Sequence, residues 1–363
     1  MSVQVSYKKQ IVVGLLLLSV FLLSIEGAVR IMEFFDPPNC SWINRDALDS
    51  VEFFRKRQLC SDVNQLVYEE SPIRLIVPNQ HFTTININSL GFRGEETTNE
   101  KLDDVYRIFV VGGSTVFGAG ATSDENTVPG FLQKKFDNSN LQFKVEVINA
   151  GIPGSHSLWE AYYVKNSLVN LQPDLIIVYD GWNDAGGLAL NAKINTDDTI
   201  KEEFEFRFKN FPFYRTPFFI SYNFLKNSPT TNQSHDKTDS IDNEIVVNSW
   251  KESWNDICQL GNKEGFKTVV LVQASTRSGN KVLSEDERVW SDVDPMIVER
   301  LSGMATSLSD LNETCDKTMD MRYIFDDISE PLFYDAAHTN DLGNEIIAEK
   351  IFELTMPLLL QHN

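Results

Sequence analysis

Residues 105–118 read VYRIFVVGGSTVFG, and this stretch decides the fold. Residues 106–111 are a short run of aromatic and β-branched side chains, which predicts a buried strand. Gly112 and Gly113 end the strand, and Ser114 follows at once. A serine on such a sharp turn can present its hydroxyl and its backbone N–H to one bound carbonyl group, as a nucleophilic serine requires. The alternative is a tight turn between a strand and a helix, because short motifs also arise by chance.

The rest of the chain alternates predicted strands and helices. The predicted strands are residues 106–111, 143–149, 175–179, 268–272 and 322–325. Helices are expected near residues 127–136, 156–171, 244–264, 285–311 and 341–360. Strands that are apolar on both sides and alternate with helices indicate a parallel sheet that is covered on both faces. The predicted fold class is therefore α/β, a three-layer α/β/α sandwich with a mainly parallel, five-stranded, flavodoxin-like sheet, whose ligand site lies at the carboxyl ends of the strands.

The amino terminus is expected to be a membrane anchor. Lys8 and Lys9 precede the apolar run of residues 11–25, and the helical pattern continues to Met32. A span over residues 11–32 is long enough for a bilayer, which needs about 20 residues. The lysines predict a cytoplasmic tail, residues 1–10, a single-pass membrane protein and a main domain outside the cytoplasm. A cleaved signal peptide is the alternative, although Ile25 and Glu26 make a poor cleavage site.

Two further segments flank or interrupt the regular pattern. Residues 33–104 form a connecting segment, with loops and one or two short strands, before the main domain of residues 105–363. The stretch NSLGFRG at 88–94 is interpreted as a turn, and a side chain of Arg93 that supports the site is the alternative. Residues 185–243 are an insertion with an aromatic part at 204–224. It is either a lid or acyl-binding wall, or an insertion with a small core of its own.

Composition limits the function classes. The chain has 363 residues and a net charge of −20, from 32 basic and 52 acidic residues. This balance argues against binding nucleic acid or anionic lipid, both of which need a basic surface. Outside the cytoplasm the four cysteines can form two disulfides, and we expect Cys40 with Cys60 and Cys258 with Cys315. No cofactor is expected, and no metal site, because no His pair or Cys cluster has ligand spacing. Glycosylation sequons begin at Asn39, Asn232 and Asn312.

Three more motifs lie at the ends of predicted strands. The third strand runs into Gly181-Trp-Asn183-Asp184, where the asparagine amide can donate to an oxyanion or the segment is a common β-turn. The second strand leads to Gly154, whose N–H is a candidate second donor. Asp335-Ala-Ala-His338 precedes the last helix, and there an imidazole can accept a serine proton while the carboxylate fixes its tautomer. A histidine before a helix can also be only a polar surface residue.

The ordered set of motifs resembles the SGNH hydrolase superfamily, also called GDSL-like esterases and lipases. The resemblance extends from about Asn88 to Leu360. GGST at 112–115 matches the nucleophile block, with Gly113 where many members have Asp. The segments around Gly154, Asn183 and His338 match the second block, the GxND block and the DxxH block.

This resemblance implies roles for individual residues. Ser114 would be the nucleophile, His338 the base and Asp335 the residue that orients His338. The N–H groups of Ser114 and Gly154, with the amide of Asn183, would form the oxyanion hole. The insertion at 185–243 is not part of the shared pattern, so the resemblance implies no particular substrate.

The expected function is hydrolysis of carboxylic esters through a Ser–His–Asp acyl-enzyme. The expected substrate is a small ester or an O-acyl group on a carbohydrate, prompted by the predicted location. One alternative is an O-acyltransferase, because it would use the same acyl-enzyme with a sugar in place of water. Another is a catalytically silent binding protein of the cell envelope, and a third is a lipase, for which the aromatic insertion is the argument. The sequence leaves the protein partners open.

Overall fold

The computed structural model describes residues 6–35, 40–70, 72–187 and 242–361. The chain divides into two compact units. One contains the helix α1 (Tyr7–Phe35), and the other contains the described residues from Ile43 onwards. Residues 188–241, which include the aromatic part of the predicted insertion, lie outside the described residues.

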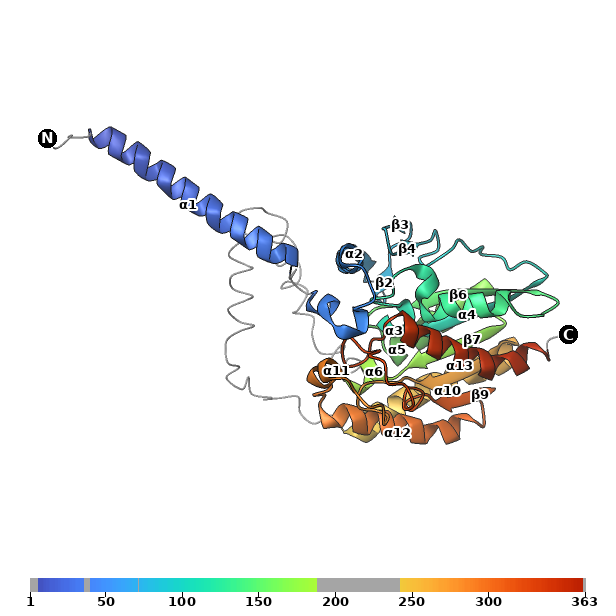
Figure 1. The fold of residues 1–363 in the computed structure, drawn as a ribbon. Coiled ribbons are helices and arrows are strands. Elements are labelled where there is room, and N and C mark those ends of the chain that lie inside the picture. The colour runs from blue at the N-terminus through green and yellow to red at the C-terminus, as the bar shows by residue number, and fades with distance from the viewer. Residues whose placement is uncertain (1–5, 36–39, 71, 188–241, 362–363) are drawn as a thin grey trace. The chain divides into compact units, whose positions relative to one another are not determined.

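The main unit is built on a parallel sheet, as predicted (Figure 1). Its five strands lie in the order β6-β5-β7-β8-β9 and pair in parallel throughout. Their bounds are β5 (Val105–Gly112), β6 (Lys144–Gly151), β7 (Leu175–Asp180), β8 (Lys267–Val272) and β9 (Lys317–Asp320). In chain order this is 2-1-3-4-5, the flavodoxin-like arrangement. The order reverses between β5 and β7, so the ends of β5, β6 and β7 lie together at the carboxyl edge.

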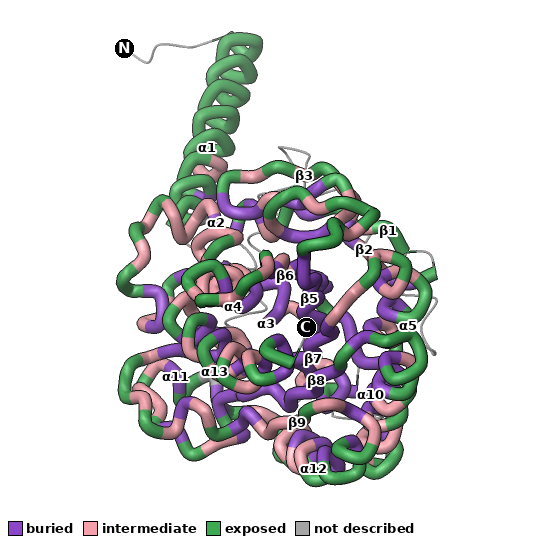
Figure 2. The backbone as a smooth tube through the Cα atoms, turned by 90° about the vertical axis from the view of Figure 1, so that its right-hand side faces the viewer, coloured by how far each residue is buried: buried purple, intermediate pink, exposed green. Residues whose placement is uncertain are grey.

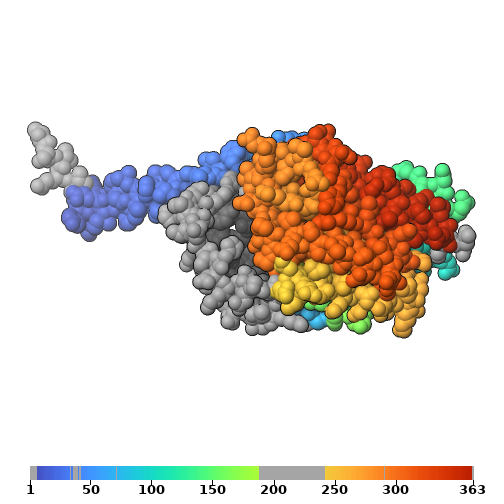
Figure 3. Space-filling view, turned by 90° about the horizontal axis from the view of Figure 1, so that it is seen from below, coloured from blue at the N-terminus to red at the C-terminus, as the bar shows by residue number. Residues whose placement is uncertain are grey.

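Helices cover both faces of the sheet, because successive side chains of a strand point to opposite faces. Phe109 and Val111 of β5 belong to the core beneath α5 (Ser157–Asn166), α10 (Asn243–Glu264) and α12 (Pro295–Leu311). Ile108 and Val110 belong to the core beneath α4 (Val128–Asp137) and α13 (Asp341–Leu359). In Figure 2 the buried strands run down the middle between these two layers. Figure 3 shows α10 (yellow) and α12 (orange) side by side on the outer surface of the first layer. The three-layer sandwich is therefore confirmed.

The fifth strand is a correction to the sequence analysis. We predicted it at residues 322–325, but the strand that pairs with β8 is Lys317–Asp320, and residues 322–325 form turns. The sequence KTMD was overlooked because an edge strand is only half-buried and need not be apolar on both faces. The aromatic run at 323–325 looked like a strand, but only Phe325 is in the core, as part of a turn.

The segment before β5 is more ordered than we expected. It contains the helix α2 (Phe53–Gln65), which the sequence analysis did not predict. The helix is polar and buries only Leu59, Cys60 and Asp62, so it has no apolar stripe that a reader of the sequence would notice. Two short antiparallel ladders follow: β1 (Tyr68–Glu69) with β2 (Leu75–Ile76), and β3 (Gln80–His81) with β4 (Asn86–Ile87). Ile76 and Ile87 of these ladders, and Ile85 between β3 and β4, pack with Phe117.

The remaining short helices are connectors. They are α3 (Ser114–Phe117), α6 (Trp182–Ala185), α11 (Glu285–Trp290) and the 3₁₀ helices η1 (Ser41–Asn44), η2 (Asp46–Leu48), η3 (Asp124–Asn126) and η4 (Leu168–Leu171). The helices α3 and α6 directly follow β5 and β7, and α5 begins shortly after β6. Their amino-terminal ends therefore lie at the carboxyl edge of the sheet (Figure 1).

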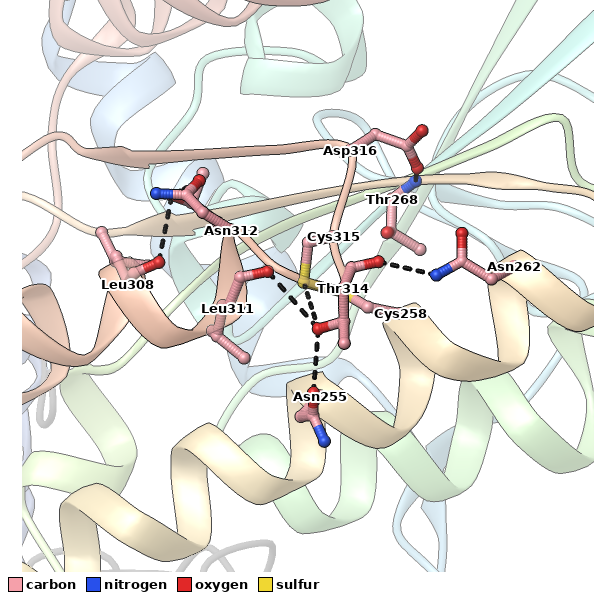
Figure 4. The surroundings of a disulfide bond; sticks show 11 residues. Asn255, Cys258, Asn262, Thr268, Leu308, Leu311, Asn312, Thr314, Cys315 and Asp316 are labelled. Atoms are coloured by element: carbon pink, nitrogen blue, oxygen red, sulfur yellow. Dashed lines mark hydrogen bonds between the residues drawn. A yellow bond between two sulfur atoms is a disulfide. The ribbon is translucent and has the colours of Figure 1, made fainter.

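Disulfides tie parts of the chain together. Cys258 of α10 is bonded to Cys315, which lies just before β9, as predicted (Figure 4). Cys40 and Cys60 are each part of a disulfide as well. The Cys258–Cys315 bond lies at the amino edge of the sheet, since β8 and β9 begin close to it. Considered by itself, α1 is long and apolar enough over Tyr7–Met32 to cross a membrane.

Candidate active site

The structure brings Ser114, His338 and Asp335 together. The hydroxyl Oγ of Ser114 lies 2.6 Å from Nε2 of His338, although 224 residues separate the two in sequence. Nδ1 of His338 lies 2.7 Å from Oδ2 of Asp335. Because a carboxylate can only accept, it fixes the proton on Nδ1 and leaves Nε2 as the acceptor for the Ser114 hydroxyl. Oδ1 of Asp335 accepts the backbone N–H groups of Ala337 and His338, at 2.9 and 2.8 Å, which holds the carboxylate in place.

The two ionisable groups shift each other's pKa. Burial alone would lower the pKa of His338, but the charge and hydrogen bond of Asp335 raise it above its ordinary value of 6.5. Burial alone would raise the pKa of Asp335, but His338 and the two backbone N–H groups lower it below its ordinary value of 3.8. The pair thus has a carboxylate that stays charged and an imidazole that readily takes a proton.

A tyrosine fixes the plane of the imidazole. The ring of Tyr334 stacks on the ring of His338, with 5.6 Å between centroids and 8° between planes. Its hydroxyl donates to the carbonyl of Ala119, just after the short helix that begins at Ser114. A side-chain carbon on Gly120 would come within 2.7 Å of this ring, so only glycine leaves room for it. Tyr334 therefore joins the segment that carries Ser114 to the segment that carries His338.

A buried glutamate holds the chain that leads to His338. The carboxylate of Glu287 is fully buried and accepts the backbone N–H groups of Leu332 and Phe333, at 2.9 and 3.0 Å. It also pairs with the ammonium of Lys281 at 3.2 Å. Because a buried carboxylate needs several donors, these contacts fix the start of the loop that leads to His338.

Arg93 supports the segment after Ser114. One of its terminal nitrogens donates to the carbonyls of Phe117 and Gly118, at 3.1 and 2.8 Å, where the short helix α3 ends. Its Nε donates to Asp124 at 2.7 Å. The side chain is 1% exposed. The interpretation of Arg93 as part of a simple turn is thus incomplete, and the alternative that we considered is the one that the contacts favour.

Asn183 and the segment of Gly154 lie beside Ser114. The amide Nδ2 of Asn183 donates to the carbonyl of Ser155 at 2.6 Å. A side-chain carbon on Gly113 would lie 2.7 Å from the same amide, so glycine permits the close approach. Gly154 is exposed and has a φ of +77°, a conformation that favours glycine. These contacts place the predicted donors around one edge of the site.

Asn183 and Ser155 connect the segments that follow β7 and β6, and the carboxylate of Asp184 connects them again through the start of α5. Asp184 accepts the backbone N–H of Ser157 at 3.0 Å and also its hydroxyl. Asp184, Asp180 and Glu160 are each 1% exposed. Burial raises the pKa of all three above the ordinary carboxyl range, and their mutual repulsion raises the pKa of Asp180 and Glu160 further. Burial also lowers the pKa of the neighbouring His156 to about 4. These buried acids therefore lie beneath the loops that follow β6 and β7 and support them.

One small pocket lies between β2 and the end of β6. It has a volume of about 60 Å³ and is lined mostly by apolar residues, which include Leu75, Ile76, Ile152 and Tyr163. In the described part of the chain, no group of three or more His, Cys, Asp or Glu side chains is placed to hold a metal ion.

Comparisons with known proteins give distant structural matches. No family model matches the sequence, and no curated protein matches it. Among solved structures, the acetyl xylan esterase AlAXEase is 17% identical, with a TM-score of 0.43, over 68% of this chain and 98% of that one. Axe2, an acetylxylan esterase from Geobacillus stearothermophilus, is 11% identical, with a TM-score of 0.40, over 68% and 93%. A putative lipolytic protein of the G-D-S-L family from Desulfitobacterium hafniense is 12% identical, with a TM-score of 0.39, over 68% and 97%.

Sequence reasoning located the residues at the centre of this arrangement and raised Arg93 as an alternative, but it missed two residues around them. Ser114, Asn183 and the Asp335–His338 pair were selected because each follows a strand or precedes the last helix. Tyr334 and Glu287 were missed. Tyr334 directly precedes Asp335, which is the one local signal that could have drawn attention to it. Glu287 lies in an ordinary helix start, SEDE, and nothing in that sequence indicates its distant contacts.

Proposed function

We propose that this chain is a serine hydrolase of carboxylic esters, of the SGNH type. The observation that carries the proposal is the chain of contacts from Ser114 Oγ to His338 Nε2 at 2.6 Å and from His338 Nδ1 to Asp335 at 2.7 Å. A serine, an imidazole and a carboxylate in this order can form and hydrolyse an acyl-enzyme. The stacked Tyr334 and the two-point support of Asp335 keep the groups aligned before substrate binds.

The proposed reaction begins when Ser114 Oγ attacks the ester carbonyl carbon while its proton passes to Nε2 of His338. The tetrahedral intermediate collapses, the bond to the alcohol oxygen breaks, and His338 returns the proton to that oxygen. Water then attacks the acyl-enzyme and gives its proton to His338. The second collapse releases the carboxylic acid and restores Ser114.

The oxyanion of each intermediate needs hydrogen-bond donors. The N–H of Ser114 is the first amide of α3, and such an amide has no partner within its own helix. The second N–H of the Asn183 amide is left over, because the amide carries two and Ser155 accepts one. We assign the third donor to the N–H of Gly154. The Asp184–Ser157 contacts would hold the last two donors at a fixed separation.

The proposal includes the location of the domain. Helix α1 would be an uncleaved single-pass anchor, and the lysines before it would keep the amino terminus in the cytoplasm. Residues 105–363 would then act outside the cytoplasm, with residues 43–104 packed on them as part of the same unit. Esters of small alcohols or of carbohydrates are the substrates that such a location would offer.

The test is to label the full chain, in detergent, with a fluorophosphonate and to follow hydrolysis of p-nitrophenyl acetate and octanoate. We expect the probe on Ser114, and loss of both labelling and turnover in Ser114→Ala. Ser139→Ala is the matched control, because Ser139 lies after the carboxyl end of α4, away from the site. Turnover at the wild-type rate by a folded Ser114→Ala chain would contradict the proposal. Higher rates on octanoate would favour a lipase, and acyl transfer to an added sugar would favour a transferase.

A further inference from the structure

An arginine lies at the end of the row of residues that forms the proposed oxyanion hole. From Ser114 the row passes through Gly113 to the amide of Asn183, and from there to the carbonyl of Ser155. Gly154, whose N–H is the third proposed donor, directly precedes Ser155 in the chain. The nearest atom that a side-chain carbon on Gly154 would meet is Nη1 of Arg74, at 3.9 Å. The guanidinium of Arg74 is therefore beside the outermost proposed donor, at the exposed edge of the site.

The surroundings of Arg74 hold its guanidinium in place but leave it accessible. The guanidinium carbon lies 3.8 Å from the centroid of the Tyr68 ring, and Tyr68 is fixed by its pairing with Ile76 across the β1–β2 ladder. The side chain of Arg74 is 37% exposed. Its charged neighbour is Glu70, whose oxygen is 3.5 Å from Nε and whose side chain is 67% exposed. An ion pair of this length between exposed groups is weak.

We propose that Arg74 recognises an anionic group on the substrate, so that the favoured esters carry a carboxylate or a phosphate near the ester carbonyl. This assignment rests on the proposed hydrolase function. A guanidinium presents planar paired N–H donors that match the oxygens of a carboxylate or phosphate, and stacking on an aromatic ring leaves those edges available. The loose pair with Glu70 would give way, because a substrate anion that touches the donors directly forms the shorter contact.

The arrangement favours an anion over a neutral hydroxyl or a cation. Among the described residues Nε of Arg74 is buried and donates no hydrogen bond, with the oxygen of Glu70 3.5 Å away, so the guanidinium keeps donor capacity that an anion can use. The chain carries a net charge of −20, and its acidic surface repels anions at long range. The positive charge of Arg74, beside the proposed donors, would offset this repulsion where the substrate binds.

The experiment compares kcat/KM for three esters on the full chain in detergent. They are p-nitrophenyl acetate, which is neutral, 4-acetoxy-3-nitrobenzoate, which has its carboxylate on the alcohol side, and mono-p-nitrophenyl adipate, which has it on the acyl side. The variants are Arg74→Gln, Arg74→Lys and Glu70→Gln, with Lys165→Gln as a control that removes an exposed cation at the far end of α5.

We expect the ratio of kcat/KM for one anionic ester to that for the neutral ester to fall about tenfold in Arg74→Gln, because a hydrogen bond to a charged group is lost in a half-exposed place. Arg74→Lys should lie between the two, since a point charge remains without the planar fork. Glu70→Gln should raise the same ratio, because it removes the competing carboxylate. The ester that responds shows whether the anion belongs to the alcohol or to the acyl group.

Three results separate the possible failures. Ratios that are equal in wild type, Arg74→Gln and Glu70→Gln, on a chain that hydrolyses esters and is labelled at Ser114, would overturn the role of Arg74 alone. A change of this ratio in the same direction in Arg74→Gln and Glu70→Gln would also overturn the role of Arg74. A folded chain that is not labelled and hydrolyses none of the three esters would overturn the proposed function, and the role of Arg74 with it.

Discussion

His338 must be neutral at Nε2 to take the proton of Ser114, so its pKa sets the lower pH limit of the proposed reaction. Asp335 raises this pKa above 6.5, against the effect of burial. The proposed activity is therefore fully present above the raised pKa and is lost as the pH falls through it. The profile of kcat/KM for p-nitrophenyl acetate between about pH 5 and 9 should show this acid limb, with its midpoint above 6.5.

Asp335→Asn tests the cause of that shift. The amide removes the charge that raises the pKa of His338, so the midpoint of the acid limb should move to lower pH. The maximal rate should fall by roughly 10³–10⁴-fold, because the imidazole loses the partner that fixes its tautomer. Asp327→Asn is the control, as an exposed carboxylate in the same segment. An unchanged midpoint in Asp335→Asn would show that Asp335 does not set the pKa.

Single residues differ in how far the sequence reveals them. Ser114 and His338 could be found because their types and their places after a strand or before a helix together indicate chemistry. Tyr334 contributes through the plane of its ring and through a contact with Ala119, which only the folded chain displays. Arg74 lies 80 residues before Gly154, and no spacing in the sequence joins the two.

Among the secondary-structure elements, the short helix α3 is the one whose position decides whether Ser114 faces His338. Its last carbonyls are bonded by Arg93 rather than by a continuing helix. Arg93→Gln should lower the free energy of unfolding by about 3–5 kcal/mol, because it leaves Asp124 and two buried carbonyls without their partner. Urea unfolding in detergent measures this.

The same substitution should slow labelling of Ser114 in the molecules that remain folded, since α3 loses its support. Asp124→Asn serves as the comparison, because it removes the charge pair but leaves the guanidinium on the carbonyls of Phe117 and Gly118. Equal labelling rates in Arg93→Gln and wild type would indicate that α3 is held by the strand and the glycines alone.

The elements that were predicted correctly are those with an apolar signal. β5, β7 and β8 are buried on both faces, and α10 carries a stripe with Trp250 and Trp254 in the core. α2 and β9 lack such a signal, because one is a polar helix and the other a half-buried edge strand. Their places depend on contacts with the rest of the chain, and local sequence does not contain that information.

At the scale of the whole molecule, the Cys258–Cys315 bond closes a loop between α10 and β9, with 57 residues of separation. The double variant Cys258→Ala, Cys315→Ala should lose roughly 4 kcal/mol of unfolding free energy by the chain-entropy relation, as the denatured chain becomes less restricted. Thermal or urea unfolding checks this. Labelling at Ser114 should persist below the transition, because the bond lies where β8 and β9 begin, at the edge of the sheet opposite to the site. Loss of labelling in the folded double variant would show that the bond acts on the site.

The fold class could be predicted from the sequence as a whole, because strands and helices alternate through most of the chain. The pairing of Cys258 with Cys315 was also predicted correctly. The alternation of strands and helices does not reveal that residues 43–104 pack on the main domain. This packing brings Arg74 and Arg93 to the site. Neither arginine belongs to a regular strand or helix that a periodic pattern could reveal.

The separation of 224 residues between Ser114 and His338 has a consequence for the making of the protein. Synthesis begins at the amino terminus, so the apolar helix and Ser114 emerge long before the imidazole does. A growing chain would carry its proposed nucleophile without a base until nearly the last helix is made. The unfinished polypeptide would therefore be inert toward the esters around it, and reactivity would appear only once the carboxyl-terminal segment has docked.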